Sequence, residues 1–111
     1  MRRPHSYHPQ ARDAAQVLGS QIAQARRRRR MPAEELCERA QISPVTLRNV
    51  ERGALTVAIG IYFEAASVLG IPLFGRGPDE LRSLREREED RLRLLPSRVF
   101  DVGALEADND F

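Results

Sequence analysis

Residues 32–53 read PAEELCERAQISPVTLRNVERG, and this stretch decides the fold. It opens on a proline followed by glutamates, which suits a helix start because proline fits the first turn and carboxylates favour the positive end of the helix dipole. That helix is predicted to run to about Ala40. Ser43 can cap a second helix with Pro44 at its first position, and Gly53 ends it. The pattern therefore predicts two short helices joined by a three-residue turn.

The apolar residues of this stretch lie where a helix-turn-helix unit buries side chains. In such a unit the second helix crosses the first steeply and projects its outer face into the major groove of DNA. Buried side chains are expected at Leu36, Ala40, Ile42, Leu47 and Val50, with Cys37 small enough for the close approach. The exposed positions are then Pro44, Val45, Thr46, Arg48 and Asn49.

Three further helices are predicted outside this stretch. An amphipathic helix from Asp13 to Arg29 is indicated by apolar residues at three- and four-residue spacing, namely Ala14, Val17, Leu18, Ile22 and Ala25. Thr56 is expected to cap a deeply buried helix whose apolar positions are Ile59, Tyr62, Phe63, Ala66 and Leu69. A charged helix begins at Pro78 and is ended by Pro96. No alternating run favours a sheet, so the fold class is all-α.

Charge is distributed unevenly along the 111 residues. Residues 1–52 carry eleven arginines against five acidic residues, whereas residues 53–111 carry seven against eleven. The first part therefore suits a polyanion. Every basic side chain is arginine, which favours bidentate contacts to phosphate and guanine, although a GC-rich genome produces the same bias.

The segment ISPVTLRNVERG, residues 42–53, resembles the recognition-helix segment of XRE-type (lambda-repressor-like) regulators, and the stretch from Leu18 to Leu73 follows their five-helix pattern. The resemblance implies a buried salt bridge between Arg26 and Glu51 that joins the first helix to the recognition helix. Three positions depart from the family pattern. Pro32 stands where a capping Ser or Thr is usual, and Ala33 replaces a customary phosphate-binding Gln. Gln41 replaces a glycine, where positive φ costs on the order of 1 kcal/mol.

The resemblance also implies DNA contacts by position. Base edges would be faced by Pro44, Val45, Thr46 and Asn49, and the DNA backbone by Ser43, Arg48 and Arg52. Because Asn bonds adenine bidentately and methyl groups contact thymine, a half-site containing A and T is expected. In the run 26–30, successive residues point to different faces, so not all of them can touch DNA. Arg29 and Arg30 are the favoured phosphate ligands there, and a solvated face is the alternative.

A narrower resemblance covers nearly the whole chain. The pieces GIYFEAASVLGIPLFG, RLRLLPSRV and the closing DNDF are similar to those of HipB-like antitoxins, which are encoded beside HipA-like Ser/Thr kinase toxins. This resemblance implies a homodimer that binds operator DNA of its own operon and neutralises a kinase toxin. Partner contacts in the tail would come from Asp108, Asp110 and Phe111, and the alternative is a tail that is only solvated.

The sequence thus predicts an all-α, five-helix lambda-repressor-like helix-turn-helix domain with a flexible N-terminal arm and an acidic C-terminal tail. The expected segments are an arm over 1–10, the DNA-binding domain over 11–75, a charged helix over 76–96 and the tail over 97–111. The charged helix bears a stripe that is either a dimer seam or a packing face, formed by Leu81, Leu84, Leu92 and Leu95. Glu88 interrupts the stripe, which disfavours a long coiled coil.

No motif favours an enzyme, because the chain has neither a glycine-rich phosphate loop nor a Cys/His pair at nucleophile spacing. His5 and His8 lack further ligands for a metal, Cys37 is expected to be inert, and no cofactor is predicted. No membrane span or signal peptide is recognised, so a cytoplasmic bacterial protein is expected. The alternatives are a stand-alone XRE-type regulator and an interaction module that retains the fold without DNA binding.

Overall fold

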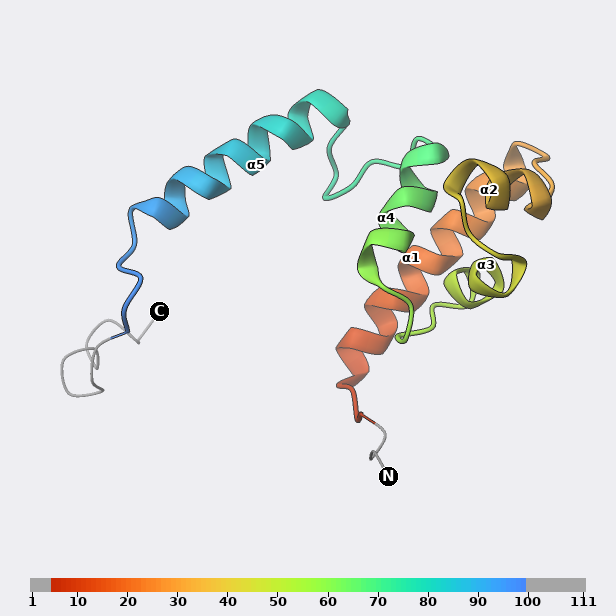
Figure 1. Cartoon of the computed structure of the whole chain (residues 1–111), viewed down its shortest axis with the longest axis horizontal. Coiled ribbons are helices and arrows are strands. Elements are labelled where there is room, and N and C mark those ends of the chain that lie inside the picture. The colour runs from red at the N-terminus through yellow and green to blue at the C-terminus, as the bar shows by residue number, and fades with distance from the viewer. Residues whose placement is uncertain (1–4, 100–111) are drawn as a thin grey trace. The chain divides into compact units, whose positions relative to one another are not determined.

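The computed structural model describes residues 5–99, and their regular structure is helical (Figure 1). The helices are α1 (Pro9–Arg28), α2 (Ala33–Ala40), α3 (Pro44–Glu51), α4 (Ile59–Val68) and α5 (Pro78–Arg93). Over the described range there is no strand, only an isolated bridge between Leu73 and Arg76. The all-α prediction is therefore confirmed. The chain divides into two units, Met1–Gly77 and Pro78–Phe111, so α5 belongs to a different unit from the other four helices.

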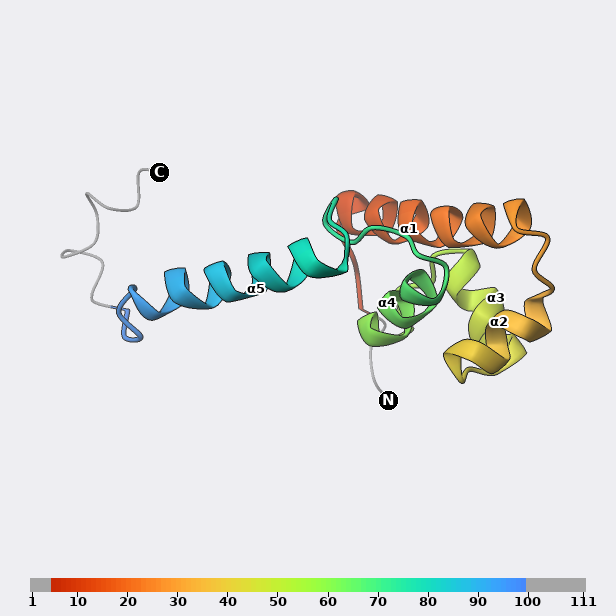
Figure 2. The same ribbon diagram turned by 90° about the horizontal axis from the view of Figure 1, so that it is seen from above.

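The first unit is organised around α1. Helices α3 and α4 pack against α1, and α2 packs against α3 and α4 (Figure 2). The largest fully buried side chains come from each of α1, α2 and α3 and from the end of α4: Ile22, Leu36, Val50 and Leu69. The predicted burial of the helix-turn-helix residues is confirmed for Leu36, Cys37, Ala40, Leu47 and Val50, and Ile42 is half-buried against them.

The contact between α1 and the end of α3 depends on Gly19. A Cβ atom at this position would lie 2.3 Å from the Val50 carbonyl oxygen and 2.9 Å from the Gly53 nitrogen. Only glycine therefore permits this approach, although glycine inside a helix costs about 1 kcal/mol relative to alanine. The close packing sets the distance between α1 and the recognition helix.

Two helix starts differ from the sequence-based expectation. Helix α1 begins at Pro9, so Pro9 and Gln10 are helical rather than part of the predicted arm. Proline suits this position because its missing N–H would have no partner in the first turn. Thr56 does not cap α4, which begins at Ile59 after Ala58 with no side-chain cap.

Three residues expected on apolar helix faces are exposed: Ala14, Val17 at 55% and Ile59 at 67%. Val17 precedes Ile22 by five positions, which turns it about 140° away from the buried face of α1. Ile59 is the first residue of α4 and lines an open hollow of about 300 Å³ between α1 and α4. The buried residues of α4 lie later in the helix, at Tyr62, Ala65 and Ala66. The strongly apolar composition of α4 therefore overstated its burial.

Helix α5 ends at Arg93, three residues before the proline that was expected to end it. Leu94 and Leu95 continue with N–H bonds to the carbonyl oxygens of Arg91 and Leu92. Leu95 therefore lies in a tight turn after the helix rather than inside it. The three predicted tail contacts, Asp108, Asp110 and Phe111, lie outside the described residues.

Candidate nucleic-acid interface

Helix α3 is held at its start by Ser43. The Ser43 hydroxyl oxygen accepts a hydrogen bond from the Thr46 N–H at 3.1 Å, as expected for an N-cap, and the hydroxyl also donates to Thr46 Oγ1 at 2.9 Å. The backbone of Gln41 just before it lies at φ 57°, so the predicted left-handed turn residue is present. These local features aim the first turn of α3.

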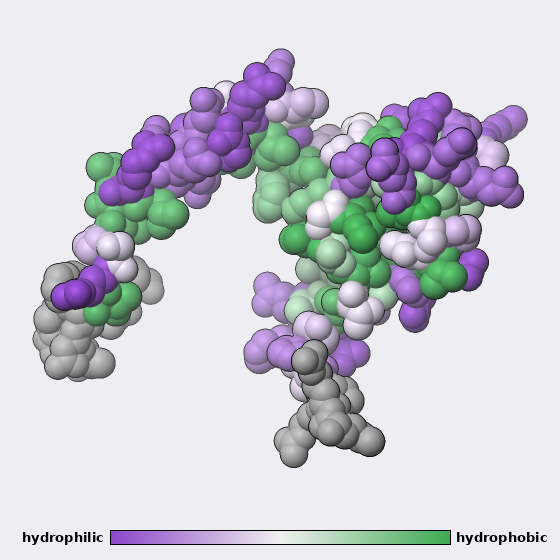
Figure 3. Space-filling model, in the orientation of Figure 1, coloured by the Kyte–Doolittle hydropathy of each residue, from purple (hydrophilic) through white to green (hydrophobic). Residues whose placement is uncertain are grey.

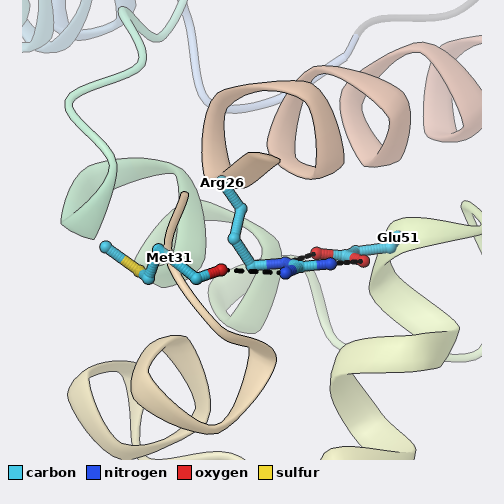
Figure 4. Close-up of polar contacts among 3 residues, drawn as sticks. All are labelled: Arg26, Met31 and Glu51. Carbon is cyan, nitrogen blue, oxygen red and sulfur yellow. Dashed lines mark hydrogen bonds and ion pairs between the residues drawn. The ribbon is translucent and has the colours of Figure 1, made fainter. Parts of the chain in front are cut away.

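At its other end α3 is tied to α1 by Arg26 and Glu51 (Figure 4). Arg26 Nε and Nη2 donate to the two Glu51 carboxylate oxygens at 2.7 and 3.1 Å. Its third nitrogen, Nη1, donates to the Met31 carbonyl oxygen at 2.9 Å, in the link between α1 and α2. The two side chains are only 14% and 15% exposed. The hydrogen bond with Glu51 raises the pKa of Arg26.

This arrangement joins three segments through one guanidinium group. A bidentate guanidinium–carboxylate pair fixes direction as well as distance, because both groups are planar. Arg26 thus carries the structural role that the resemblance implied, and it is not available to a phosphate while these bonds are made. Helix α3 is consequently anchored at both ends, by a cap at the first turn and by an ion pair at the last.

The outer face of α3 carries the side chains predicted to contact DNA. Pro44, Val45 and Arg48 are exposed, and Val45 retains 56% of its accessible surface. Thr46 and Asn49 are half-buried on the same helix. The inner face is formed by Leu47 and Val50, both buried. The helix therefore presents a mixed apolar, amide and cationic surface while its opposite side is held in the core.

Arg52 is linked to the predicted base-reading residue, a contact that the sequence analysis missed. Its Nε donates to Asn49 Oδ1 at 3.1 Å. The amide oxygen has two lone pairs, so one remains available for the exocyclic amine of adenine, while the amide NH₂ stays free to donate. The bond orients the Asn49 amide. Its only sequence signal is the three-residue separation, which brings side chains together on a helix.

Arg29 and Arg30 do not share a contact network with α3. Both are exposed, and Arg30 lies at φ 54°. A Cβ at Gly70 would lie 3.3 Å from Arg29 Nη2, so this guanidinium reaches the carboxyl-terminal end of α4. Such an end carries partial negative charge, which suits a nearby guanidinium, and sequence spacing did not reveal this proximity.

The described residues hold few other groups capable of chemistry. Cys37 is a free, buried thiol, and within residues 5–99 no cluster of three or more His, Cys, Asp or Glu side chains could hold a metal ion. The hollow between α1 and α4 has an apolar lining, and the one titratable group there, Tyr62, donates its hydroxyl to the Ala54 carbonyl oxygen at 2.6 Å. None of the helices in the described range is long and apolar enough to cross a membrane.

No curated protein and no solved structure matches the chain. A match is found with one protein family, described as helix-turn-helix, over residues 22–75. This range contains Arg26, the α2–turn–α3 unit and all of α4. Residues 22–75 are thus similar to the helix-turn-helix family, and this similarity indicates a DNA-binding regulator of the XRE type.

Proposed function

We propose that the protein is a transcriptional repressor that binds double-stranded operator DNA as a homodimer, with α3 in the major groove. The observation that carries the proposal is the anchoring of α3 at both ends, by Ser43 at the start and by Arg26 at the end. A recognition helix must keep its outer side chains in register with base pairs, and pre-organised side chains lose less freedom on binding. DNA binding is assigned to residues 11–75.

Roles on α3 follow from exposure and chemistry. Base edges are read by Pro44, Val45, Thr46 and Asn49, and phosphates are bound by Ser43, Arg48 and Arg52. Arg29 and Arg30 are assigned to flanking phosphates. Arg29 also lies near the carboxyl-terminal end of α4. Because Arg52 already bonds Asn49, a phosphate contact by Arg52 would bring the backbone and the base-reading amide into one connected arrangement.

The experiment measures binding of the full chain to a labelled duplex from the region upstream of its own gene, at several salt concentrations. Arg48→Ala should weaken binding on all sequences and reduce the salt slope by about 1, because one phosphate contact is lost. Asn49→Ala should lose discrimination worth about 1–3 kcal/mol at adenine positions while the salt slope stays unchanged. Arg39→Ala, which removes an exposed cation from α2, is the control and should change neither quantity.

A second candidate function is an interaction module that retains this fold without binding DNA. The observation that favours it is the exposure on α3 of Pro44 and Val45, whose side chains have no hydrogen-bonding group to read a base edge. It predicts no preference for duplex DNA over other polyanions and no effect of the Asn49 substitution. Equal, salt-insensitive binding of operator and random duplex would therefore replace the repressor proposal with this one.

A finer proposal makes the protein the antitoxin of a HipA-like Ser/Thr kinase, as opposed to a stand-alone XRE-type regulator. It is supported by the sequence resemblance of residues 60–75 and 91–99 and of the closing DNDF. The test is titration of the full chain into a HipA-like kinase encoded beside it, with autophosphorylation as the readout. A chain ending at Val99 lacks Asp108, Asp110 and Phe111 and should inhibit less while binding DNA normally. No inhibition by either chain favours the stand-alone regulator.

A further inference from the structure

The outer face of α3 offers few groups that can form hydrogen bonds with a base edge. Figure 3 shows apolar and hydrophilic side chains next to one another where α3 lies. Pro44 and Val45 have no hydrogen-bonding atom in their side chains. The Thr46 hydroxyl already accepts a hydrogen bond from the Ser43 hydroxyl at 2.9 Å. The amide of Asn49, which combines donors with an acceptor, therefore has the largest hydrogen-bonding capacity among the residues proposed to read bases.

The Asn49 amide is held in one of its two orientations. Arg52 Nε donates to Asn49 Oδ1 at 3.1 Å. A guanidinium group has N–H donors and no acceptor, so the amide atom that faces it must be the oxygen. Turning the amide over would place its NH₂ group against the same N–H donor and would lose the bond. Arg52 therefore distinguishes the oxygen of Asn49 from the NH₂ group, although the two have nearly the same shape.

The backbone that carries both residues is tied to the core. Arg52 is the first residue after α3, and its N–H donates to the Arg48 carbonyl oxygen at 3.2 Å. The Asn49 carbonyl oxygen accepts from the Ala54 N–H at 2.9 Å. The Ala54 carbonyl oxygen accepts in turn from the hydroxyl of Tyr62, a buried residue of α4, at 2.6 Å. The hydrogen bond between the two side chains thus joins groups on a fixed segment.

A fixed amide orientation distinguishes the two purines. On the major-groove edge adenine offers an amine donor beside its N7 acceptor, whereas guanine offers two acceptors, O6 and N7. In the bidentate arrangement Asn49 bonds both groups of adenine, but at guanine it sets its oxygen against O6. An amide free to turn over would present its NH₂ group to O6 instead. Because turning over loses the Arg52 bond, this adaptation to guanine is penalised.

We propose that Arg52 is a positioning residue that makes Asn49 select adenine over guanine, in addition to its phosphate contact. This role rests on the proposed DNA binding and names the source of one base preference. Arg52 acts through Asn49 rather than on the base itself. The matched control is Arg48, which has the same charge on the same helix and makes no side-chain hydrogen bond to Asn49.

The first test selects duplexes from a random-sequence pool with the full chain and reads the selected bases by sequencing. Asn49→Ala identifies the position that Asn49 reads, because the base preference is lost there. At that position Arg52→Ala should shift the adenine-to-guanine ratio toward guanine by about fivefold, which corresponds to one net hydrogen bond. Arg48→Ala should weaken binding on all sequences and keep the ratio. The protein with both Asn49→Ala and Arg52→Ala should show the base preferences of Asn49→Ala alone.

Two kinds of failure are distinguishable in this selection. An equal ratio in the Arg52→Ala and Arg48→Ala proteins, at a site that the unsubstituted chain does select, would overturn the positioning role and leave Arg52 as a phosphate ligand. Selection of no duplex by the unsubstituted chain would overturn the proposed DNA binding, and the role of Arg52 with it.

A second measurement uses the free full chain and needs no DNA. NMR relaxation of the Asn49 side-chain NH₂ group reports how strongly the amide is held. Arg52→Ala should lower the order parameter of this group, whereas Arg48→Ala should leave it unchanged. Equal order parameters in the two variants and the unsubstituted chain would show that Arg52 does not hold the amide, and would overturn the inference.

Discussion

Removing the carboxylate of Glu51 should destabilise the protein more than removing one partner from any of the exposed ion pairs within residues 5–99. Loss of one partner costs about 3–5 kcal/mol in a buried pair and about 0–1 kcal/mol in an exposed pair. Arg26 and Glu51 retain 14% and 15% exposure and make two direct bonds, so they lie nearer the buried limit. We expect Glu51→Ala to cost about 2–3 kcal/mol and to lower Tm by roughly 10–20 °C.

The assay is a double-mutant cycle of Arg26→Ala and Glu51→Ala, followed by urea unfolding at neutral pH in low and high salt. The coupling energy should be about 2 kcal/mol and should survive high salt, because partly buried pairs are weakly screened. The control cycle uses Glu35 and Arg39, whose side chains are 40% and 57% exposed, and should give about 0.5 kcal/mol or less. Equal coupling in the two cycles would refute the reasoning.

Three other substitutions have defined outcomes. Gly19→Ala should destabilise the first unit by about 2–3 kcal/mol in urea unfolding, because its Cβ meets the Val50 carbonyl oxygen; an unchanged midpoint would contradict the close packing. Gln41→Gly should raise the free energy of unfolding by about 1 kcal/mol, and with it the urea midpoint at an unchanged m-value, because the φ of Gln41 is 57°. A lower midpoint would count against backbone strain at this residue. Burial raises the pKa of the Tyr62 phenol, so its contribution is complete below the unfolded value near 10 and declines as pH rises through the raised pKa. Tyr62→Phe should lose about 1 kcal/mol at neutral pH with the bond to Ala54, and its stability should fall less in alkali; parallel declines would exclude Tyr62 as the source.

Local signals predicted the helix-turn-helix closely. Ser43 caps α3, Pro44 begins it and Gln41 takes the left-handed turn, each as expected from chemistry confined to about one turn of chain. The same reasoning failed at Thr56, because a good capping residue does not determine where a helix starts when the preceding loop is held from elsewhere. That loop is tied to α4 by the Tyr62–Ala54 hydrogen bond, which joins residues eight positions apart.

Some residues of the candidate site could likewise be predicted from local sequence, and others could not. The exposed face of α3 follows from helix period and from the burial of Leu47 and Val50, so its residues could be named in advance. The Arg26–Glu51 pair was expected only through a family resemblance, since no local rule joins residues 25 positions apart. The place of Arg29 beside Gly70 was not foreseen, because it depends on where α4 ends relative to α1.

The sequence by itself determined the helices of the first unit, the turn between α2 and α3, and the side of α3 that faces away from the core. These features depend on neighbours within a turn or two, where backbone geometry leaves few choices. Only the tertiary structure decided the approach of α1 to α3 at Gly19 and the third bond of Arg26 to Met31. Those features depend on how helices cross and close upon one another, and that is set by packing of the whole core rather than by any single segment.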